Sequence, residues 1–301
     1  MTAETDRPPV RTHAVDADHA ARAAGVTVRT VQDVTGIAAV ADFFSDVWRT
    51  PRQAPPLPAE VMHSLVHAGG AVHAAHTLDG DRLAGACVAV FGPPAAADAY
   101  SLLAAADRGV GYAVKQAQRS WLLEHGARTL RWTFDPLVGR NARFNLVKLG
   151  ARGTEYLVDF YGRMADGVNE GDESDRLTVT WDLTAHREGG ETGEGRETGE
   201  GSETGEGRET GDRAAAPVTH LAPDGAPLAR RSHDDRQVWC RVPDDIVALR
   251  AADPALALRW RHAVRDVFTG AFAEGFTATG MSRDGWYTLS RTFTREEESP
   301  A

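Results

Sequence analysis

The sequence predicts a mixed α/β fold in which a sheet carries helices on both faces. Over residues 26–184 the predicted elements follow the order helix, helix, three strands, helix, strand, helix and further strands, which is typical of this class. Residues 83–91 form an apolar run rich in valine and alanine, as expected for a strand buried on both faces. With 301 residues and 42% apolar content, the chain can bury a full core.

The first elements are predicted from apolar periodicity and from its interruptions. Residues 1–25 are rich in proline, aspartate and alanine with weak periodicity, so we expect a flexible tail with some helix near 16–24. A short strand is expected at 25–29. Apolar residues at helical spacing then predict helices over 33–49 and 57–68.

Three strands and a long helix follow. Residues 71–78 and 83–91 are predicted strands joined by the turn Asp79-Gly80-Asp81, and 99–106 forms the next strand. The helix after it has one apolar side, and its opposite, polar side carries Lys115, Gln118 and Arg119.

The remainder of the predicted core contains shorter elements. Residues 129–134 are a strand that Asp135-Pro136 ends, and a short helix over 140–149 stops at Gly150. Two further strands are expected over 152–158 and 176–183.

A low-complexity segment separates this core from a C-terminal extension. Residues 191–211 repeat Glu-Thr-Gly-Glu-Gly-Arg/Ser with a period of six and contain no apolar residue, so we expect 185–216 to be a flexible linker. The extension, 217–294, is predicted to pack on the core. Its expected elements are a strand at 237–242, a helix after Asp245, a helix capped by Asp253, and a hairpin of 276–281 with 286–293.

Composition excludes several classes of function. The formal charge is −10, of which residues 188–212 carry −7, and no basic stripe is present, so nucleic acid is not an expected partner. Cys87 and Cys240 are too few for a disulfide framework or a thiolate metal site, and we expect both to be buried. His73 and His76 point to opposite faces of a strand, so no shared metal is expected.

With no apolar membrane span and no leader-like start, we expect a soluble cytoplasmic protein. The oligomeric state, including a homodimer, is left open.

The turn before the long helix has the features of an anion-binding site. Arg108-Gly109-Val110-Gly111-Tyr112-Ala113 opens directly onto the helix, whose first N–H groups lack partners and lie at the positive end of its dipole. Glycines there let a phosphate approach the backbone. The turn therefore suits a phosphate or pyrophosphate ligand.

Several blocks of the chain resemble the GNAT superfamily of acyl-coenzyme A-dependent acyltransferases, and more narrowly a bacterial subgroup of predicted acetyltransferases. Together they cover most of the chain outside the tail and the linker. The blocks are the turn 108–113, Trp132-Thr133-Phe134-Asp135-Pro136-Leu137, Arg140-Asn141-Ala142, Asn145-Leu146-Val147-Lys148-Leu149-Gly150-Ala151, Phe160-Tyr161-Gly162 and 254–261.

The resemblance implies a GNAT-like fold that binds acetyl-coenzyme A or another acyl-coenzyme A. No metal is expected, because the sequence shows no metal-ligand spacing. The strand 99–106 and its neighbour 129–134 would part, so that the pantetheine arm pairs with Leu103, Ala104, Ala105 and Ala106. The pyrophosphate would lie on Arg108, Gly109, Val110, Gly111, Tyr112 and Ala113, and Asn141 or Asn145 would bind the pantetheine. Two positions depart from the family pattern: Ala106 replaces a common Gln or Arg, and Leu146 replaces a tyrosine that often protonates the departing thiolate.

Candidates for the chemistry follow from what N-acylation needs, namely a neutral amine, a polarised carbonyl and a proton route. Asp135, at the end of a strand, is the candidate base, with an Asp-Pro turn residue as the alternative. Tyr161, or Tyr156 in its place, is the candidate acid, with a packed tyrosine as the alternative. A substrate carboxylate would require Arg140 or Arg143. A solvated helix face accounts for at least half of the basic residues in this stretch, which are Arg108, Lys115, Arg119, Arg140, Arg143 and Lys148.

Two functions therefore remain from the sequence. One is an N-acyltransferase that transfers an acetyl or other short acyl group to a small-molecule amine by direct attack. The other is a GNAT-fold protein with little turnover that binds acyl-coenzyme A or a metabolite as a sensor. The retained glycines and Asn141 favour the first, and Ala106 and Leu146 favour the second.

Overall fold

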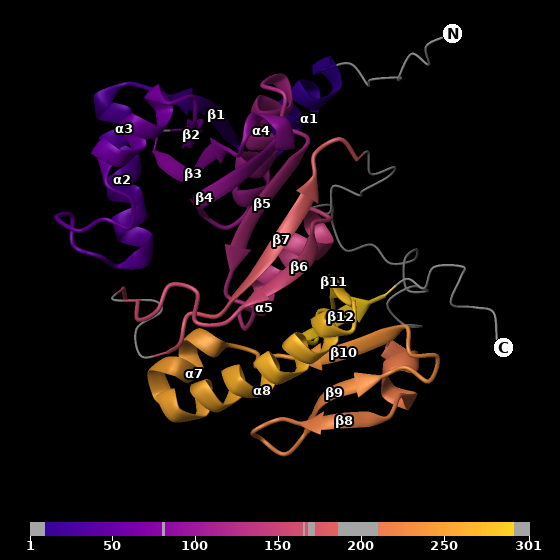
Figure 1. The fold of residues 1–301 in the computed structure, drawn as a ribbon. Coiled ribbons are helices and arrows are strands. Elements are labelled where there is room, and N and C mark those ends of the chain that lie inside the picture. Colours follow the sequence, from indigo (N-terminus) through magenta and orange to yellow (C-terminus); the bar gives the residue numbers. More distant parts are fainter. Residues whose placement is uncertain (1–9, 80–81, 165, 168–171, 186–209, 292–301) are drawn as a thin grey trace, which may run out of the picture. The chain divides into compact units, whose positions relative to one another are not determined.

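A computed structural model describes residues 10–79, 82–164, 166–167, 172–185 and 210–291 (Figure 1). Two compact units make up the chain. The first unit runs to Trp132 and includes the short segments 166–168 and 182–184; the second unit holds the remainder. This division differs from the predicted one, because residues 133–165 and 169–181, which we assigned to the core, belong with the C-terminal extension.

The first unit is a five-stranded mixed sheet with helices on both faces. Its strands follow the order β1-β2-β3-β4-β5, antiparallel up to β4, while β4 and β5 are parallel. Thr133 and Phe134 at the end of β5 belong to the second unit. The elements are α1 (Val10–Ala23), β1 (Val26–Val31), α2 (Val34–Trp48), α3 (Ala59–His67), β2 (Ala71–Thr77), β3 (Leu83–Phe91), the 3-10 turn η1 (Pro94–Ala96), β4 (Asp98–Ala106), α4 (Gly111–Glu124) and β5 (Thr129–Phe134).

Alternating side chains of the strands divide the core of the first unit into two layers. One face, with Val72, Ala74, Ala86 and Val88, lies under α2 and α3. The opposite face, with Ala75, Ala84 and Cys87, lies under α1 and α4. Figure 1 shows the two helix pairs on either side of the strands. The sheet prediction is therefore confirmed for this unit.

The N-terminal tail prediction is wrong for most of its length. Residues 10–23 form the helix α1, which packs against α4 and buries Ala17 and Ala20. The helix expected near 16–24 lies inside α1, and weak periodicity concealed it because α1 contacts α4 through small alanines instead of large apolar side chains.

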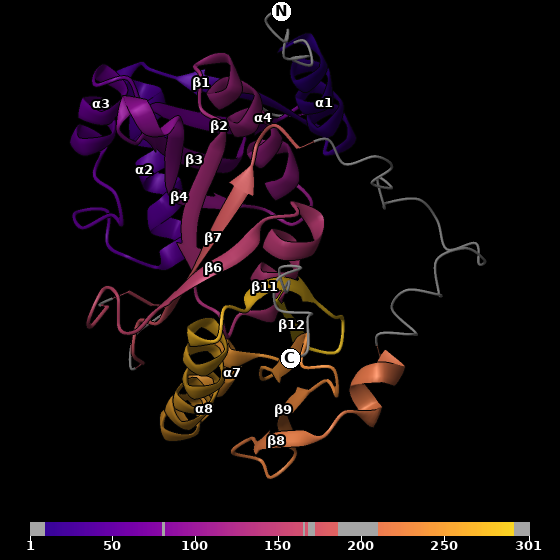
Figure 2. The same ribbon diagram turned by 45° about the vertical axis from the view of Figure 1, so that its right-hand side comes forward.

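The second unit is an antiparallel sheet flanked by the C-terminal helices. Its strands follow the order β7-β6-β11-β12-β10-β9-β8. Figure 2 shows α7 and α8 alongside these strands, and α8 contacts β6, β9 and β10. The elements are α5 (Gly139–Ala142), the π-helical segment η2 (Arg143–Lys148), β6 (Arg152–Leu157), β7 (Arg176–Asp182), β8 (Val218–Leu221), β9 (Pro227–Arg231), β10 (Gln237–Arg241), α7 (Ile246–Ala252), α8 (Pro254–Ala273), β11 (Thr277–Met281) and β12 (Trp286–Ser290).

Local signals set the boundaries of α8. Asp253 accepts a hydrogen bond from the Leu256 N–H at 2.9 Å, and Pro254 occupies the first position, as predicted.

The buried Phe268 of α8 meets the ring of Tyr287 edge-on at 5.0 Å, and the Tyr287 hydroxyl donates to the Pro136 carbonyl at 2.8 Å. The extension therefore packs on the segment that follows β5.

Some predictions for the second unit need correction or lie outside the described residues. Strands β8 and β9 were not predicted, and the short helix expected over 140–149 is divided into α5 and the π-helical η2. Most of the predicted linker, 186–209, and the turn residues Gly80 and Asp81 lie outside the described residues. In the described ranges, no helix has the length and apolar content needed to cross a membrane.

Candidate functional site

Strand β4 parts from its parallel neighbour after a short paired stretch. The last pair that joins β4 and β5 is Tyr100 with Arg131, while β4 continues and stays paired with β3 as far as Ala106. Beyond the parting, Leu102 and Ala104 are exposed. The edge of β4 that faced β5 is thus available to an extended amide chain, which can complete the strand's hydrogen-bonding ladder.

The predicted pantetheine residues occupy this open part of β4. Ala104 and Ala106 are exposed, whereas Leu103 and Ala105 pack partly against the core under α2 and α3. At Ala104 and Ala106 the exposed side chains are small, which gives a ligand close access to the backbone there, whereas Leu102 at the parting is a larger exposed side chain. The parting that the family resemblance implies is therefore present in the first unit.

The turn after β4 is held at its base and open at its middle. The Asp107 N–H donates to the Ala84 carbonyl at 2.8 Å, and the Asp107 carboxylate accepts from Arg82 at 2.7 Å. Gly109 has φ +89°, and no atom lies within 4 Å of the place where a Cβ would stand. The left-handed conformation needs a glycine at this position, and the space beside it suits a ligand.

Helix α4 begins immediately after this turn and is uncapped. Val110 stands at the N-cap without a side-chain hydrogen bond to the first turn, and the first turn carries no carboxylate. A helix of 14 residues has a full dipole, whose positive end lies at this first turn. With the exposed Arg108 beside it, the turn fits a pyrophosphate group.

The polar side of α4 does not face solvent. Lys115, Gln118 and Arg119 are all buried, with exposed fractions of 4%, 0% and 9%. Lys115 contacts the sheet, and Arg119 donates to the Leu183 carbonyl at 2.9 Å. The solvated-face interpretation is therefore wrong for these two basic residues, because α1, the sheet and the segment around Leu183 enclose α4.

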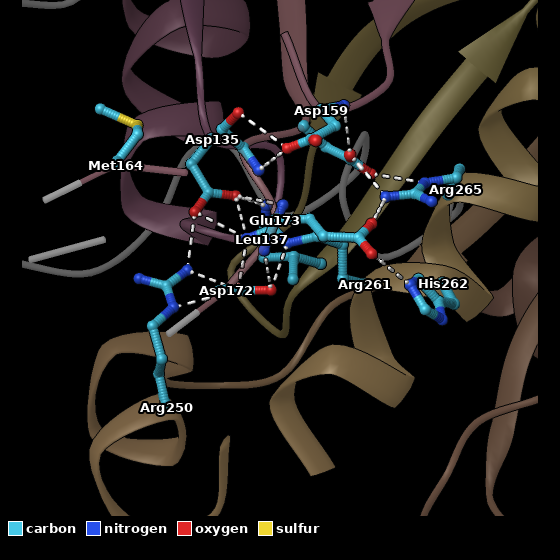
Figure 3. Close-up of polar contacts among 12 residues, drawn as sticks. Asp135, Leu137, Asp159, Met164, Asp172, Glu173, Arg250, Arg261, His262 and Arg265 are labelled. Carbon is cyan, nitrogen blue, oxygen red and sulfur yellow. Dashed lines mark hydrogen bonds and ion pairs between the residues drawn. The ribbon is translucent and has the colours of Figure 1, made fainter. Parts of the chain in front are cut away.

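Asp135, the candidate base, lies in a buried cluster of charges in the second unit (Figure 3). Its carboxylate accepts from Arg250 Nη2 at 2.9 Å and from Arg261 Nη2 at 3.1 Å, and the Leu137 N–H donates to it at 3.0 Å. Burial by itself raises the pKa of Asp135, but the two guanidinium groups, chiefly Arg261, outweigh it and hold the pKa below its usual value. These surroundings favour the structural alternative, an Asp-Pro turn residue, since such a carboxylate is a weak proton acceptor.

The cluster continues into the segment before β7. Asp172 accepts from Arg261 Nη2 at 2.7 Å and from Arg250 Nε at 3.0 Å. Arg265, one turn further along α8, donates to Asp175 at 2.7 Å. Because each buried carboxylate is paired with a guanidinium, the cluster joins α7 and α8 to the segments at 135 and 172–175.

The two candidate tyrosines have different surroundings. The Tyr156 hydroxyl donates to Asp175 at 2.8 Å, and burial followed by this carboxylate raises the pKa of Tyr156 well above its usual value. Tyr161 is 50% exposed, and its hydroxyl lies 3.3 Å from Thr133 Oγ1 on β5. Tyr161 is therefore the half-exposed tyrosine of the two, whereas Tyr156 is held in a structural contact with Asp175.

The amide and arginine candidates lie on α5 and η2 of the second unit. Asn141 is exposed and Asn145 is 5% exposed, inside the π-helical segment. Arg140 is exposed, whereas Arg143 Nη1 donates to the Met281 carbonyl of β11 at 2.9 Å. A π-helical segment often marks a functional position. Of the two arginines, Arg140 is the more available to a substrate.

The predicted site residues thus divide between the units. The strand and turn positions from Leu103 to Ala113 are brought together in the first unit, and Asp135, Tyr161, Asn141 and Arg140 belong to the second unit. Sequence reasoning missed His73 and Lys115 in the first unit as polar groups of the core. It also missed Asp172, Arg250 and Arg261. The signal for the two arginines is that basic residues interrupt the apolar faces of α7 and α8, and Asp172 has no comparable signal. In the described part of the chain, no three side chains of the usual metal-ligand types gather.

Comparisons with known proteins find acetyltransferases among similar solved structures. No protein-family model and no curated protein sequence matches the chain. An N-acetyltransferase from Staphylococcus aureus Mu50 aligns with 52% of this chain and 98% of its own, at 12% identity and a TM-score of 0.42. A ribosomal-protein-S5-alanine acetyltransferase from Vibrio fischeri aligns over 53% and 93%, at 12% identity and 0.42. An acetyltransferase from Salmonella typhimurium with its cofactor acetyl-CoA aligns over 55% and 98%, at 12% identity and 0.41. With TM-scores below 0.5, these likenesses carry no argument about the activity of this chain.

Proposed function

We propose that this chain is an acyl-coenzyme A-dependent N-acyltransferase of the GNAT type, acting on a small-molecule amine in the cytoplasm. The observation that carries the proposal is the parting of the parallel strands β4 and β5 after Tyr100 and Arg131, followed directly by the uncapped start of α4. An open strand edge accepts the amides of a pantetheine arm, and an uncapped helix start accepts its pyrophosphate. A coenzyme A thioester presents amides and a pyrophosphate at the two ends of such a path.

The reaction class follows from this ligand. The acyl-coenzyme A supplies an activated carbonyl; a neutral amine forms the new C–N bond as the C–S bond breaks, and the thiolate takes up a proton. The role of β4 is to orient the thioester, since N–H groups on its open edge can polarise the carbonyl. Tyr161, a half-exposed residue whose hydroxyl lies beside Thr133, is the proposed proton donor to the thiolate. Asp135 is assigned no proton transfer, because two arginines hold its carboxylate.

The acceptor is proposed to be a small amine, with Arg140 available for a carboxylate if the amine carries one. Asn141 is the proposed amide contact for the pantetheine, since it is exposed whereas Asn145 is buried. The competing function, a sensor with little turnover, rests on Leu146, which is buried at 3% exposure and offers no acid from the short helix.

A thiol-release assay distinguishes the two functions. Acetyl- and succinyl-coenzyme A are incubated with the protein and a panel of amines, and free thiol is measured alongside thermal-shift binding of each thioester. The enzyme function predicts amine-dependent thiol release. Binding without release on any amine would instead identify the sensor, and absence of binding would reject the assignment of the turn.

Two glycine variants at opposite ends of α4 test the pyrophosphate site. Gly111→Asp places a carboxylate in the first turn, where it suits the helix dipole and is expected to leave the thermal stability unchanged or slightly raised. It should weaken coenzyme A binding at least about tenfold by repelling the pyrophosphate. Gly126→Asp, beyond the other end of the helix, is the control that adds the same charge; its φ of +91° disfavours aspartate, so it should lower the thermal stability and leave binding unchanged when affinity is measured well below its Tm. Equal affinity of the two variants would contradict the site.

A further inference from the structure

A buried lysine stands where β4 and β5 part. Lys115 of α4 is 4% exposed, and its Nζ donates to Ser101 Oγ and to Gln118 Oε1, both at 2.9 Å. The same ammonium lies 4.2 Å from the ring centroid of Trp132. The last β4–β5 pair is Tyr100 with Arg131, so Ser101 and Trp132 are the next residue on each strand. Lys115 therefore contacts both strands at the vertex of the parting.

Hydrogen-bond donors exceed acceptors around this lysine. The Nε2 group of Gln118, a donor, is buried without a hydrogen-bond partner among the described residues. Both ring nitrogens of His73 are buried without a partner there as well, and in the neutral imidazole one of them is a donor and the other an acceptor. None of the ion pairs in the described ranges includes Lys115, so no carboxylate of the chain neutralises it there. A buried ammonium without an anion is unfavourable. A donor-rich, positively charged site of this kind suits an anion.

The choice of residue at this position supports a special role. The chain has 33 lysine and arginine residues, and only Lys115 and Lys148 of these are lysines. Lysine has a compact charge on a flexible stem, so its ammonium can turn from one acceptor to another. Arginine instead presents a rigid planar fork of donors.

The direction of β4 leads a ligand from the turn to this vertex. From Ala106 to Ser101 the strand covers about 17 Å at ~3.3 Å per residue. A pantetheine arm laid along β4, with its pyrophosphate at the turn, therefore carries its acyl group toward Ser101 and Lys115. On the proposed function, the group nearest the lysine is the acyl chain.

We propose that Lys115 recognises a carboxylate on the acyl group, so that the acyl donor is a coenzyme A thioester of a dicarboxylic acid. The inference rests on the proposed function, since it requires the acyl-coenzyme A to lie along β4. The acyl carboxylate would replace Gln118 as a partner of the ammonium and would accept from the unpartnered Nε2 group. Lys115 is thereby a specificity-determining residue for the acyl group.

Succinyl- and butyryl-coenzyme A provide a matched test, because they have four-carbon acyl chains that differ chiefly in the terminal carboxylate. Binding is measured by calorimetry without an amine, so that no turnover occurs. The wild type should bind succinyl-coenzyme A about tenfold to a hundredfold more tightly than butyryl-coenzyme A. Lys115→Met should abolish this preference and retain butyryl-coenzyme A binding, whereas Lys148→Met, at an exposed lysine, should keep it.

A measurement on the wild type keeps the test valid if Lys115→Met fails to fold. With only two lysines, isotope labelling of the lysine side chains gives two amine signals that Lys148→Arg assigns. Burial lowers the pKa of Lys115 to about 8, so its signal should titrate near that pH, and at a higher pH with succinyl-coenzyme A bound.

The charged and titratable neighbours of Lys115 leave this pH range clear. Burial, then Lys115 and His125, lowers the pKa of His73 to about 4, and burial raises the pKa of Cys87 to about 12. Arg119, the other cation on this side of α4, stays charged throughout. A change near pH 8 in the ligand preference is therefore assigned to Lys115.

The outcomes separate this inference from the function on which it rests. Equal binding of the two thioesters by the wild type, or a Lys115 signal that succinyl-coenzyme A leaves unchanged, would overturn the recognition of a carboxylate and leave the acyltransferase proposal intact. Binding of neither thioester would overturn both.

Discussion

Replacing Asp135 by asparagine should lower the free energy of unfolding of this protein. It should leave the acyl-transfer activity of the folded protein unchanged. The substitution keeps the shape of the side chain but removes the charge that pairs with Arg250 and Arg261, whose side chains are 5% and 0% exposed. Among the ion pairs of the described residues, the carboxylate of Asp172 would then be left facing both cations. Removing one partner of a buried ion pair typically destabilises a protein by about 3–5 kcal/mol, so we expect a loss in this range.

Urea denaturation at pH 7 measures this loss, with Asp224→Asn as the matched control. Asp224 also pairs with an arginine through two hydrogen bonds, Arg241 Nη2 to each oxygen at 2.8 Å, but its side chain is 43% exposed. An exposed pair of this kind contributes roughly 1 kcal/mol or less. Because the pKa of Asp135 is lowered, its stabilisation is present above the ordinary pKa of aspartate and is lost as the pH falls through the lowered value. A small stability loss together with a large loss of thiol release would refute the structural role and restore Asp135 as a base.

Three further predictions follow from buried polar groups and from the two tyrosines. Because the pKa of Lys115 is lowered to about 8, the unfolded chain binds more protons than the folded protein between pH 8 and 10.5. The free energy of unfolding of the wild type, relative to that of Lys115→Met, should therefore rise by up to about 3 kcal/mol as the pH rises across this range, measured by urea denaturation. Because the pKa of His73 is lowered to about 4, the wild type should lose up to about 3 kcal/mol relative to His73→Leu as the pH falls from 6.5 to 4, and parallel curves would contradict the burial of a neutral imidazole. Tyr161→Phe should lower kcat about a hundredfold or more with little change in Tm, whereas Tyr156→Phe should lower Tm with little change in kcat; the reverse pattern would exchange their roles.

Local signals in the sequence were sufficient for most elements of the fold. The apolar run 83–91 matches β3 in full, and the Asp253-Pro254 pair marks the start of α8. The glycine turn was also local, because Gly109 adopts a positive φ and α4 begins two residues later. These features depend on residues close together in the chain, which is why periodicity and capping rules identify them.

Contacts between residues far apart in the chain determine the features of the site that the sequence did not predict. The fate of Asp135 depends on Arg261, 126 residues away, and on Arg250, 115 residues away. The contacts of the buried Lys115 come from Ser101 of β4 and Trp132 of β5, which lie 14 and 17 residues away in the sequence. No property of the sequence around Asp135 or Lys115 indicates these partners. A residue that the local sequence predicts to be a base or a solvated cation can therefore belong to the core.

A crystal structure of the protein with coenzyme A is the most direct test of the proposed cofactor site on β4 and the turn that follows it. We predict the pyrophosphate within hydrogen-bond distance of the N–H groups from Gly109 to Ala113, and the pantetheine amides paired with β4 between Leu103 and Ala105. Coenzyme A bound elsewhere, or an unchanged and empty edge of β4 beside it, would contradict the assignment of this strand and turn.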